Sequence, residues 1–99
     1  MIYEVSITVP RSHQEQFTDF LSKHLEQMVL LSAIKKALAF RLHEPHQGEK
    51  IGFVVHYEME SLNAYELYLR DDAAKMRAEG EKLFGAVWNV SRRALIPML

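Results

Sequence analysis

The chain has 99 residues, of which 48% are hydrophobic and 25% are charged, the proportions of one globular domain and not of a disordered segment. Twelve Lys and Arg against thirteen Asp and Glu give a net charge of -1, which argues against a nucleic-acid partner selected by bulk charge. The absence of cysteine excludes disulfides, thiol nucleophiles and thiolate metal sites, and it fits a reducing compartment.

A strand is predicted at the start of the chain, where residues 2–9 alternate between apolar and polar side chains. The apolar face carries Tyr3, Val5, Ile7 and Val9. This start lacks the basic and apolar regions of a signal peptide, and no apolar stretch is long enough to cross a bilayer. We therefore expect a cytoplasmic protein with no membrane partner.

A helix is predicted next, because apolar residues recur at spacings of three and four. They are Phe17, Phe20, Leu21, Leu25, Met28 and Leu31. Ser12 and Glu15 have the spacing of a capping box, in which each side chain accepts a hydrogen bond from the other residue's backbone N–H. This spacing predicts that the helix begins after Ser12.

Residues 34–42 fit a helix by composition, since Ala, Leu and Lys are good helix formers. We interpret them as a strand because four apolar residues occupy even-numbered positions, as they would on one face of a strand. The exception on that face is the charged Lys36. The four apolar residues are Ile34, Leu38, Phe40 and Leu42. Pro45 and Gly48 predict a turn over residues 44–48, and residues 50–59 form the clearest strand.

A second helix is predicted after Ser61, which can cap it. Its apolar stripe contains Leu62, Tyr65, Leu69, Ala73 and Met76. The pair Asp71 and Asp72 marks a kink, and Gly80 or Gly85 ends the helix. A final strand over residues 87–95 places Trp88, Val90 and Ala94 opposite Asn89, Ser91 and Arg93.

The order β-α-β-β-α-β is that of the split βαβ fold. Right-handed crossovers arrange the strands in the order four, one, three, two, with both helices on one face. The sequence therefore predicts one α+β, ferredoxin-like domain over residues 1–99. The other face of its antiparallel sheet is left open.

Four segments resemble a short bacterial family known as domain of unknown function number 4286, within the dimeric α/β-barrel superfamily: "IYEVSITV", "FVVHYEMES", "YLRDDAAKMRAEGEKLFG" and "VSRRAL". The resemblance implies a ferredoxin-like fold and a homodimer whose open sheet faces meet. Some members of that superfamily are small oxygenases, including quinone-forming and haem-degrading types. The Asn, Trp and His set of the haem-degrading types has no match here, so neither His24 nor Trp88 is assigned a role.

One polar cluster is predicted on the open face, where the start of the first strand meets the ends of the third and fourth. It consists of Glu4, His56, Glu58 and Arg93, with Lys35 close by. Such groups can perform acid–base chemistry. We favour the interpretation that they are cross-strand ion pairs, each worth about 0.2–1 kcal/mol, that fix register or a dimer interface. Arg93 is predicted to pair with Glu4, with Glu58 as a further candidate partner.

Three other patterns are weaker. His43 and His46 flank the turn but lack a third ligand, so no metal site is expected. Gly52, Phe53 and Val54 match part of an RNA-recognition motif, in which aromatic residues occupy two further positions. Those positions are Ile51 and His56 here. A pocket between the second helix and the sheet is a further option. The side chains that would line it are at helical spacing, and a stripe of that kind is more often plain core. Its residues are Tyr65, Tyr68, Met76 and Phe84.

The sequence does not specify a function. We expect a homodimer, joined through the open sheet face, that binds a small molecule or acts as a scaffold. The apolar residues available for this contact are Ile2, Val54, Val87, Leu95 and the tail 96–99. The alternative is a cofactor-free oxygenase or isomerase with a pocket between sheet and helices, and an RNA-binding module is third. No cofactor and no nucleic-acid partner are expected.

Overall fold

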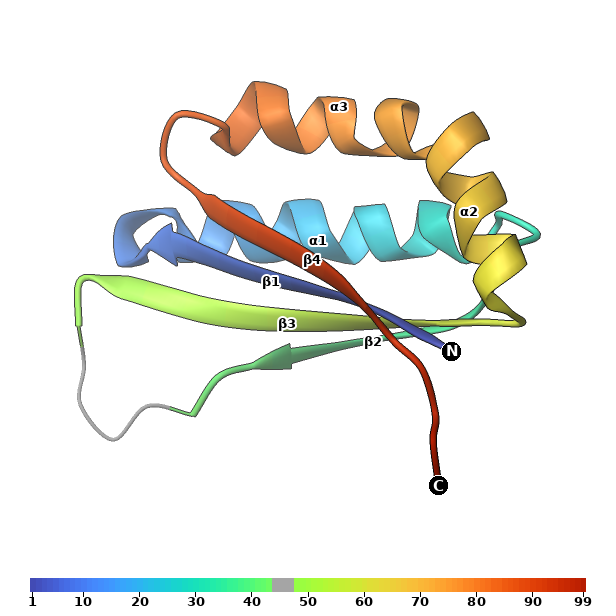
Figure 1. Cartoon of the computed structure of the whole chain (residues 1–99). Helices are drawn as coiled ribbons and strands as arrows, with labels where there is room; N and C mark the ends of the chain where they lie inside the picture. Colours follow the sequence, from blue (N-terminus) through green and yellow to red (C-terminus); the bar gives the residue numbers. More distant parts are fainter. Residues whose placement is uncertain (44–47) are drawn as a thin grey trace.

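The computed structural model of the protein describes residues 1–43 and 48–99, which form an antiparallel sheet with helices on one face (Figure 1). The described strands are β1 (Ile2–Pro10), β2 (Ile34–Arg41), β3 (Lys50–Met59) and β4 (Asn89–Leu95). The helices in the same part of the chain are α1 (Gln14–Met28), α2 (Leu62–Asp71) and α3 (Ala73–Phe84), with a short 3-10 turn, η1 (Arg11–His13), before α1. The strand order β2-β3-β1-β4 is the predicted one, which confirms the ferredoxin-like topology.

The core lies between the sheet and the helices, because alternate residues of β1 and β3 point to the helix layer. The predicted apolar face of β1 is buried, and so are Phe17, Leu21 and Met28 of α1. The Phe17 ring lies 4.9 Å from that of Phe53 and 5.4 Å from that of Phe84. Aromatic packing of this kind joins α1, β3 and α3.

The interpretation of residues 34–42 as a strand is confirmed, but the predicted shared face is wrong. The register shifts between Ile34 and Lys36, so Ile34 is in the core while Leu38 and Phe40 lie on the open face, each nearly half exposed. The physical reason is a β-bulge, which inserts one residue and reverses the alternation after it. The bulge therefore adds two large apolar side chains to the open face.

The two predicted helix caps have different outcomes. The Ser61 hydroxyl accepts a hydrogen bond from the Ala64 N–H at 3.1 Å, as predicted. The capping box is wrong, because α1 begins at Gln14 without a side-chain cap. Ser12 lies one residue before the N-cap position, His13, inside the 3-10 turn that leads out of β1, and its hydroxyl contacts Nδ1 of His13 at 3.2 Å.

The kink predicted at Asp71 and Asp72 is confirmed, since α2 ends and α3 begins there at an angle (Figure 1). Gly85, and not Gly80, follows the end of α3. The predicted stripe is wrong for α2, because Leu62 and Leu69 are exposed while Tyr68 is buried. The break reorients α2, so one apolar stripe cannot continue through both helices.

The last strand begins two residues later than predicted. Trp88 lies before β4 and stacks against Phe84 at 5.9 Å, and Val87 packs against the core and not on the open face. The predicted turn lies outside the described residues except for Gly48. Among the described helices, none has the length and apolar character needed to cross a membrane.

Candidate functional site

Three of the four predicted site residues meet on the open face, and we call them the open-face cluster: Glu4, His56 and Arg93. Glu4 of β1 lies opposite His56 of β3 and Arg93 of β4 in the sheet register. Arg93 Nε donates to Glu4 Oε1 at 2.6 Å, and His56 Nε2 lies 2.8 Å from Glu4 Oε2. The pairing predicted between Arg93 and Glu4 is therefore present.

Glu58 belongs to a different pair. Its carboxylate lies 3.9 Å from Lys35 Nζ, and the same amine lies 3.4 Å from Glu60. Lys35 lies at the register shift of β2, on the edge of the sheet. These side chains are all about half exposed or more, so the pairs contribute little.

The Glu4 carboxylate is the buried member of the open-face cluster. Its side chain is 10% exposed, whereas that of Arg93 is 70% exposed. Hydrogen bonds with His56 and then Arg93 lower the pKa of Glu4, against the opposing effect of burial. Because its pKa is lowered, this carboxylate is charged at neutral pH. It is not a free general base, because both of its oxygens already accept or share hydrogen bonds with Arg93 and His56.

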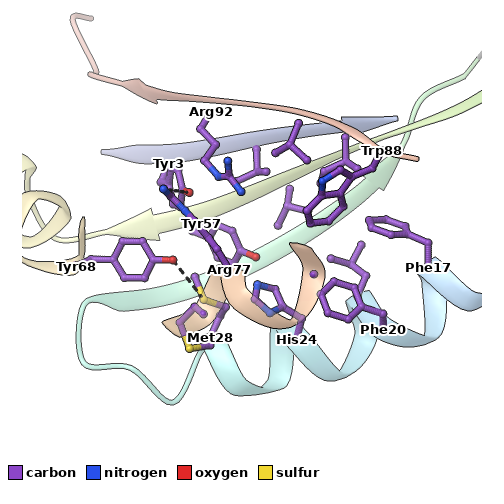
Figure 2. A pocket seen from close by; sticks show the side chains of 17 residues that line it. Tyr3, Phe17, Phe20, His24, Met28, Tyr57, Tyr68, Arg77, Trp88 and Arg92 are labelled. Carbon is purple, nitrogen blue, oxygen red and sulfur yellow. Dashed lines mark hydrogen bonds between the residues drawn. The ribbon is translucent and has the colours of Figure 1, made fainter. Parts of the chain in front are cut away.

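A cavity of about 50 Å³ lies on the other side of the sheet, between it and the helices (Figure 2). One water needs roughly 10–15 Å³ on this measure, so the cavity can hold about four water-sized groups. Most of its lining is apolar. Its polar lining side chains are Tyr3, Tyr57, Tyr68, His24, Arg77 and Arg92.

Two arginines give this inner cavity its charge. Arg92 lies beside Val5 on the core-facing side of β4, and Arg77 of α3 donates from Nη2 to the Tyr3 hydroxyl at 3.0 Å. Within the described residues, neither guanidinium is in an ion pair, and the buried Nε of Arg77 has no acceptor. A buried donor without an acceptor costs about 1–3 kcal/mol. No Asp or Glu is among the lining residues, so the inner cavity is positive.

Tyrosines form the deep part of the cavity. Tyr3 and Tyr57 lie opposite each other on β1 and β3, with their rings stacked 5.6 Å apart. Burial raises the pKa of Tyr57, and burial followed by the nearby Tyr3 raises the pKa of Tyr68 to about 12. Both hydroxyls therefore keep their protons at neutral pH and can donate hydrogen bonds. Among the described residues, the Tyr68 hydroxyl meets only the weak sulfur acceptor of Met28, at 3.8 Å.

His24 and Trp88 are the half-buried part of the lining. The His24 ring stacks on Phe20 at 5.4 Å, and burial lowers the pKa of His24 more than the nearby Glu79 raises it. The imidazole is therefore neutral at neutral pH. The Trp88 indole lies against Gly80 of α3, where an added Cβ would come within 2.5 Å of it. Glycine at this position allows the close approach of helix and indole.

Comparison with known proteins identifies the chain's family. Residues 1–97 match the family described as domain of unknown function (DUF4286). The chain belongs to this family. No curated protein sequence matches this DUF4286 protein.

Solved structures share its fold at low sequence identity. An EthD-family protein from Bacillus halodurans has a TM-score of 0.68 and 11% identity, covering 97% of this chain and 100% of its own. A dimeric ferredoxin-like protein from an uncultured marine organism has a TM-score of 0.66 and 15% identity, with coverages of 99% and 97%. SnoaB, a cofactor-independent oxygenase from Streptomyces nogalater, has a TM-score of 0.63 and 8% identity, with coverages of 99% and 93%. These likenesses show a ferredoxin-like fold.

The arginines of the inner cavity were missed by the sequence analysis, although each leaves a signal. Arg92 lies on the same face of β4 as Val90 and Ala94, because the three residues are two positions apart. Arg77 follows Ala73 by four residues, which places it on the buried face of α3. A charged residue in an apolar stripe is the pattern to look for. Such residues are almost never buried unless they are paired.

The predicted tyrosine pocket is half right. Tyr68 and Met76 line the inner cavity, but Phe84 is fully buried core and Tyr65 packs against Tyr3 at 5.1 Å. His43 is exposed after β2, and His46 lies outside the described residues. In the described part of the chain, no three His, Cys, Asp or Glu side chains are grouped so as to hold a metal ion.

Proposed function

We propose that this DUF4286 protein is a homodimer that binds a small molecule in the inner cavity. The composition of that cavity carries the proposal: apolar walls surround a few convergent polar groups, which is the usual character of a ligand site. Within the described residues the two guanidiniums have no acidic partner, and the buried Nε of Arg77 has no acceptor, although buried donors are normally satisfied. A bound molecule would supply the missing partner.

The dimer is supported by the open face. Leu38 and Phe40 are 46% and 48% exposed there, and the tail residues Ile96, Met98 and Leu99 are more exposed still. Figure 1 shows that tail running away from the helix layer, past the open side of the sheet. A second copy placed on this face would cover the apolar side chains and complete the burial of Glu4. One relative of the same fold is described as dimeric.

Ligand binding can be followed through Trp88, which is the only tryptophan of the chain and lines the inner cavity. We expect compounds that enter the cavity to change its fluorescence and to shift the amide resonances of α3 and β4. The variant Trp88→Phe should lose the optical signal but keep the resonance shifts. If no member of a diverse fragment library shifts resonances around the cavity, the ligand-binding proposal is wrong.

The dimer can be tested by light scattering at micromolar concentration, where we expect twice the chain mass of 11.5 kDa. Phe40→Glu should give a monomer, because it places a charge in the proposed contact. Leu67→Glu is the matched control, since Leu67 of α2 is similarly exposed, at 42%, but belongs to the helix layer. A monomer mass for the unchanged chain would contradict the proposal.

A cofactor-free isomerase or oxygenase is the second candidate, and the neutral His24 favours it. Its imidazole can accept a proton from an acidic C–H or O–H of a bound ligand. Arg77 and Arg92 would stabilise the resulting enolate or phenolate. Returning the proton to another atom completes an isomerisation, whereas an oxygenation requires addition of O₂ to the carbanion. SnoaB, with the same fold, is described as a cofactor-independent oxygenase.

Solvent deuterium exchange separates this candidate from simple binding. If His24 moves a proton, a bound carbon acid should exchange its acidic hydrogen faster with the protein than in buffer. His24→Gln should bind the same compound and abolish that acceleration. Equal acceleration by both proteins would exclude His24 as the base.

A further inference from the structure

We infer that the molecule bound in the inner cavity is a small organic carboxylate, held by the guanidiniums of Arg77 and Arg92. This inference rests on the proposed function, because it names the class of ligand for the same cavity.

The first argument is charge. Both guanidiniums line this one cavity, and Arg77 donates to the Tyr3 hydroxyl within it. The acids that act on the lining side chains are Asp72, near Tyr68, and Glu79, near His24, and neither is part of the lining. An anion between the arginines would balance a charge that the described residues leave unbalanced.

The second argument is the set of available donors. A guanidinium carries five N–H groups in a planar fork that matches the two oxygens of a carboxylate. Arg77 uses one of them for Tyr3, and its Nε has no acceptor within the described chain. Figure 2 shows Tyr57 in the same part of the cavity, with no hydrogen bond from its hydroxyl to the other side chains drawn. Donors from β3, β4 and α3 therefore line one cavity, and within the described residues the buried Nε of Arg77 has no acceptor.

The third argument is size and wall chemistry. A volume of about 50 Å³ fits a carboxylate with one or two further carbons. The walls next to the arginines are hydrocarbon, from Val5, Val55 and Val90. They would contact the carbon chain of an organic acid but would leave the remaining oxygens of inorganic phosphate without donors. A larger acid such as benzoate would need the Trp88 indole to move.

The test compares propionate with propionamide, a neutral molecule of the same shape, at constant ionic strength. Binding is measured by Trp88 fluorescence and by amide resonance shifts. We expect propionate to bind about tenfold more tightly or better, because hydrogen bonds between charged groups are stronger than neutral ones. Arg77→Met and Arg92→Met should each reduce this preference to less than about twofold, because the lost positive charge favours propionate over propionamide. Arg70→Met is the control, since Arg70 is exposed and paired with Asp71.

The outcomes separate the two proposals. Equal binding of propionate and propionamide, insensitive to both arginine variants, would overturn the carboxylate class and leave small-molecule binding standing. Tighter binding of inorganic phosphate than of propionate, with the same dependence on arginine, would also overturn it. If neither probe, benzoate nor the fragment library binds at the cavity, the inference and the proposed function both fail. Because Arg77 also contacts Tyr3, its variant can lose stability, and Arg92→Met then decides the question alone.

Discussion

Arg92 and Arg93 are neighbours in the chain, and they lie on opposite faces of the same strand in opposite surroundings. Arg93 meets the buried carboxylate of Glu4, which His56 also contacts. Arg92 lines a cavity whose described lining contains aromatic and apolar side chains and a second arginine, but no carboxylate. Removing a charge whose partner is buried in the fold leaves that partner stranded and destabilises the fold, whereas a charge without such a partner is available to a ligand. We therefore propose a structural role for the open face and ligand binding for the inner cavity.

Replacing each of the two arginines by methionine is the strongest test of this difference. Arg93→Met should lower the free energy of unfolding by about 1.5–3 kcal/mol at neutral pH, because it removes a charged donor from the Glu4 carboxylate, which is 10% exposed. Arg92→Met should change it by less than about 1 kcal/mol, since no buried group loses its partner. Chemical denaturation measures both. Equal losses, or an unchanged midpoint for Arg93→Met, would break the comparison.

Glu4→Gln tests the open-face cluster by changing the hydrogen-bond acceptor instead of a donor. We expect a loss of about 1.5–3 kcal/mol at neutral pH, because both charge-assisted hydrogen bonds are weakened. The pKa of Glu4 is lowered from 4.5, so its stabilisation is fully present above that pH and is lost as the pH falls through the folded-state value. The difference between variant and unchanged protein should therefore narrow in urea denaturation at pH 3. A difference that stays constant with pH would show that the carboxylate charge is not what stabilises the sheet.

Gly80→Ala tests the inner cavity without touching a charge. The added methyl group would meet the Trp88 indole at 2.5 Å and Phe20 at 3.2 Å, so both rings must shift. We expect a stability loss of about 1–2 kcal/mol, an altered Trp88 emission spectrum and weaker ligand binding. Gly48→Ala is the control, because nothing lies within 4 Å of its added Cβ. Unchanged emission and binding would mean that Trp88 does not limit the cavity.

Lys35→Met should have the smallest effect. Its amine and the two carboxylates near it are exposed, so we expect a change of less than about 0.5 kcal/mol. Thermal or chemical denaturation can measure this against Arg93→Met. A loss comparable to that of Arg93→Met would mean that Glu58 and Lys35 belong to a buried part of the proposed dimer contact, which would extend the open-face cluster.

The sequence by itself determined the architecture and much of the open face. Alternation in residues 2–9 and 50–59 shows which side chains share a face, and antiparallel neighbours then bring Glu4, His56 and Arg93 to one end of the sheet. The sequence did not reveal the bulge at Lys35, because the alternation of apolar and polar residues does not show where a strand contains an inserted residue. Nor did it reveal the direction of α2 before the break at Asp72, which depends on packing against β3.

Only the tertiary structure decided the inner cavity. The periodicity of a sequence indicates on which face of a helix or strand a residue lies. It does not indicate which residues of the next layer pack against that face. Arg77 of α3, Arg92 of β4 and His24 of α1 are far apart in the sequence, and they line one space because the helices pack across the sheet. Whether such a space is filled or left open depends on the fit of side chains from all these elements at once, which no single segment contains.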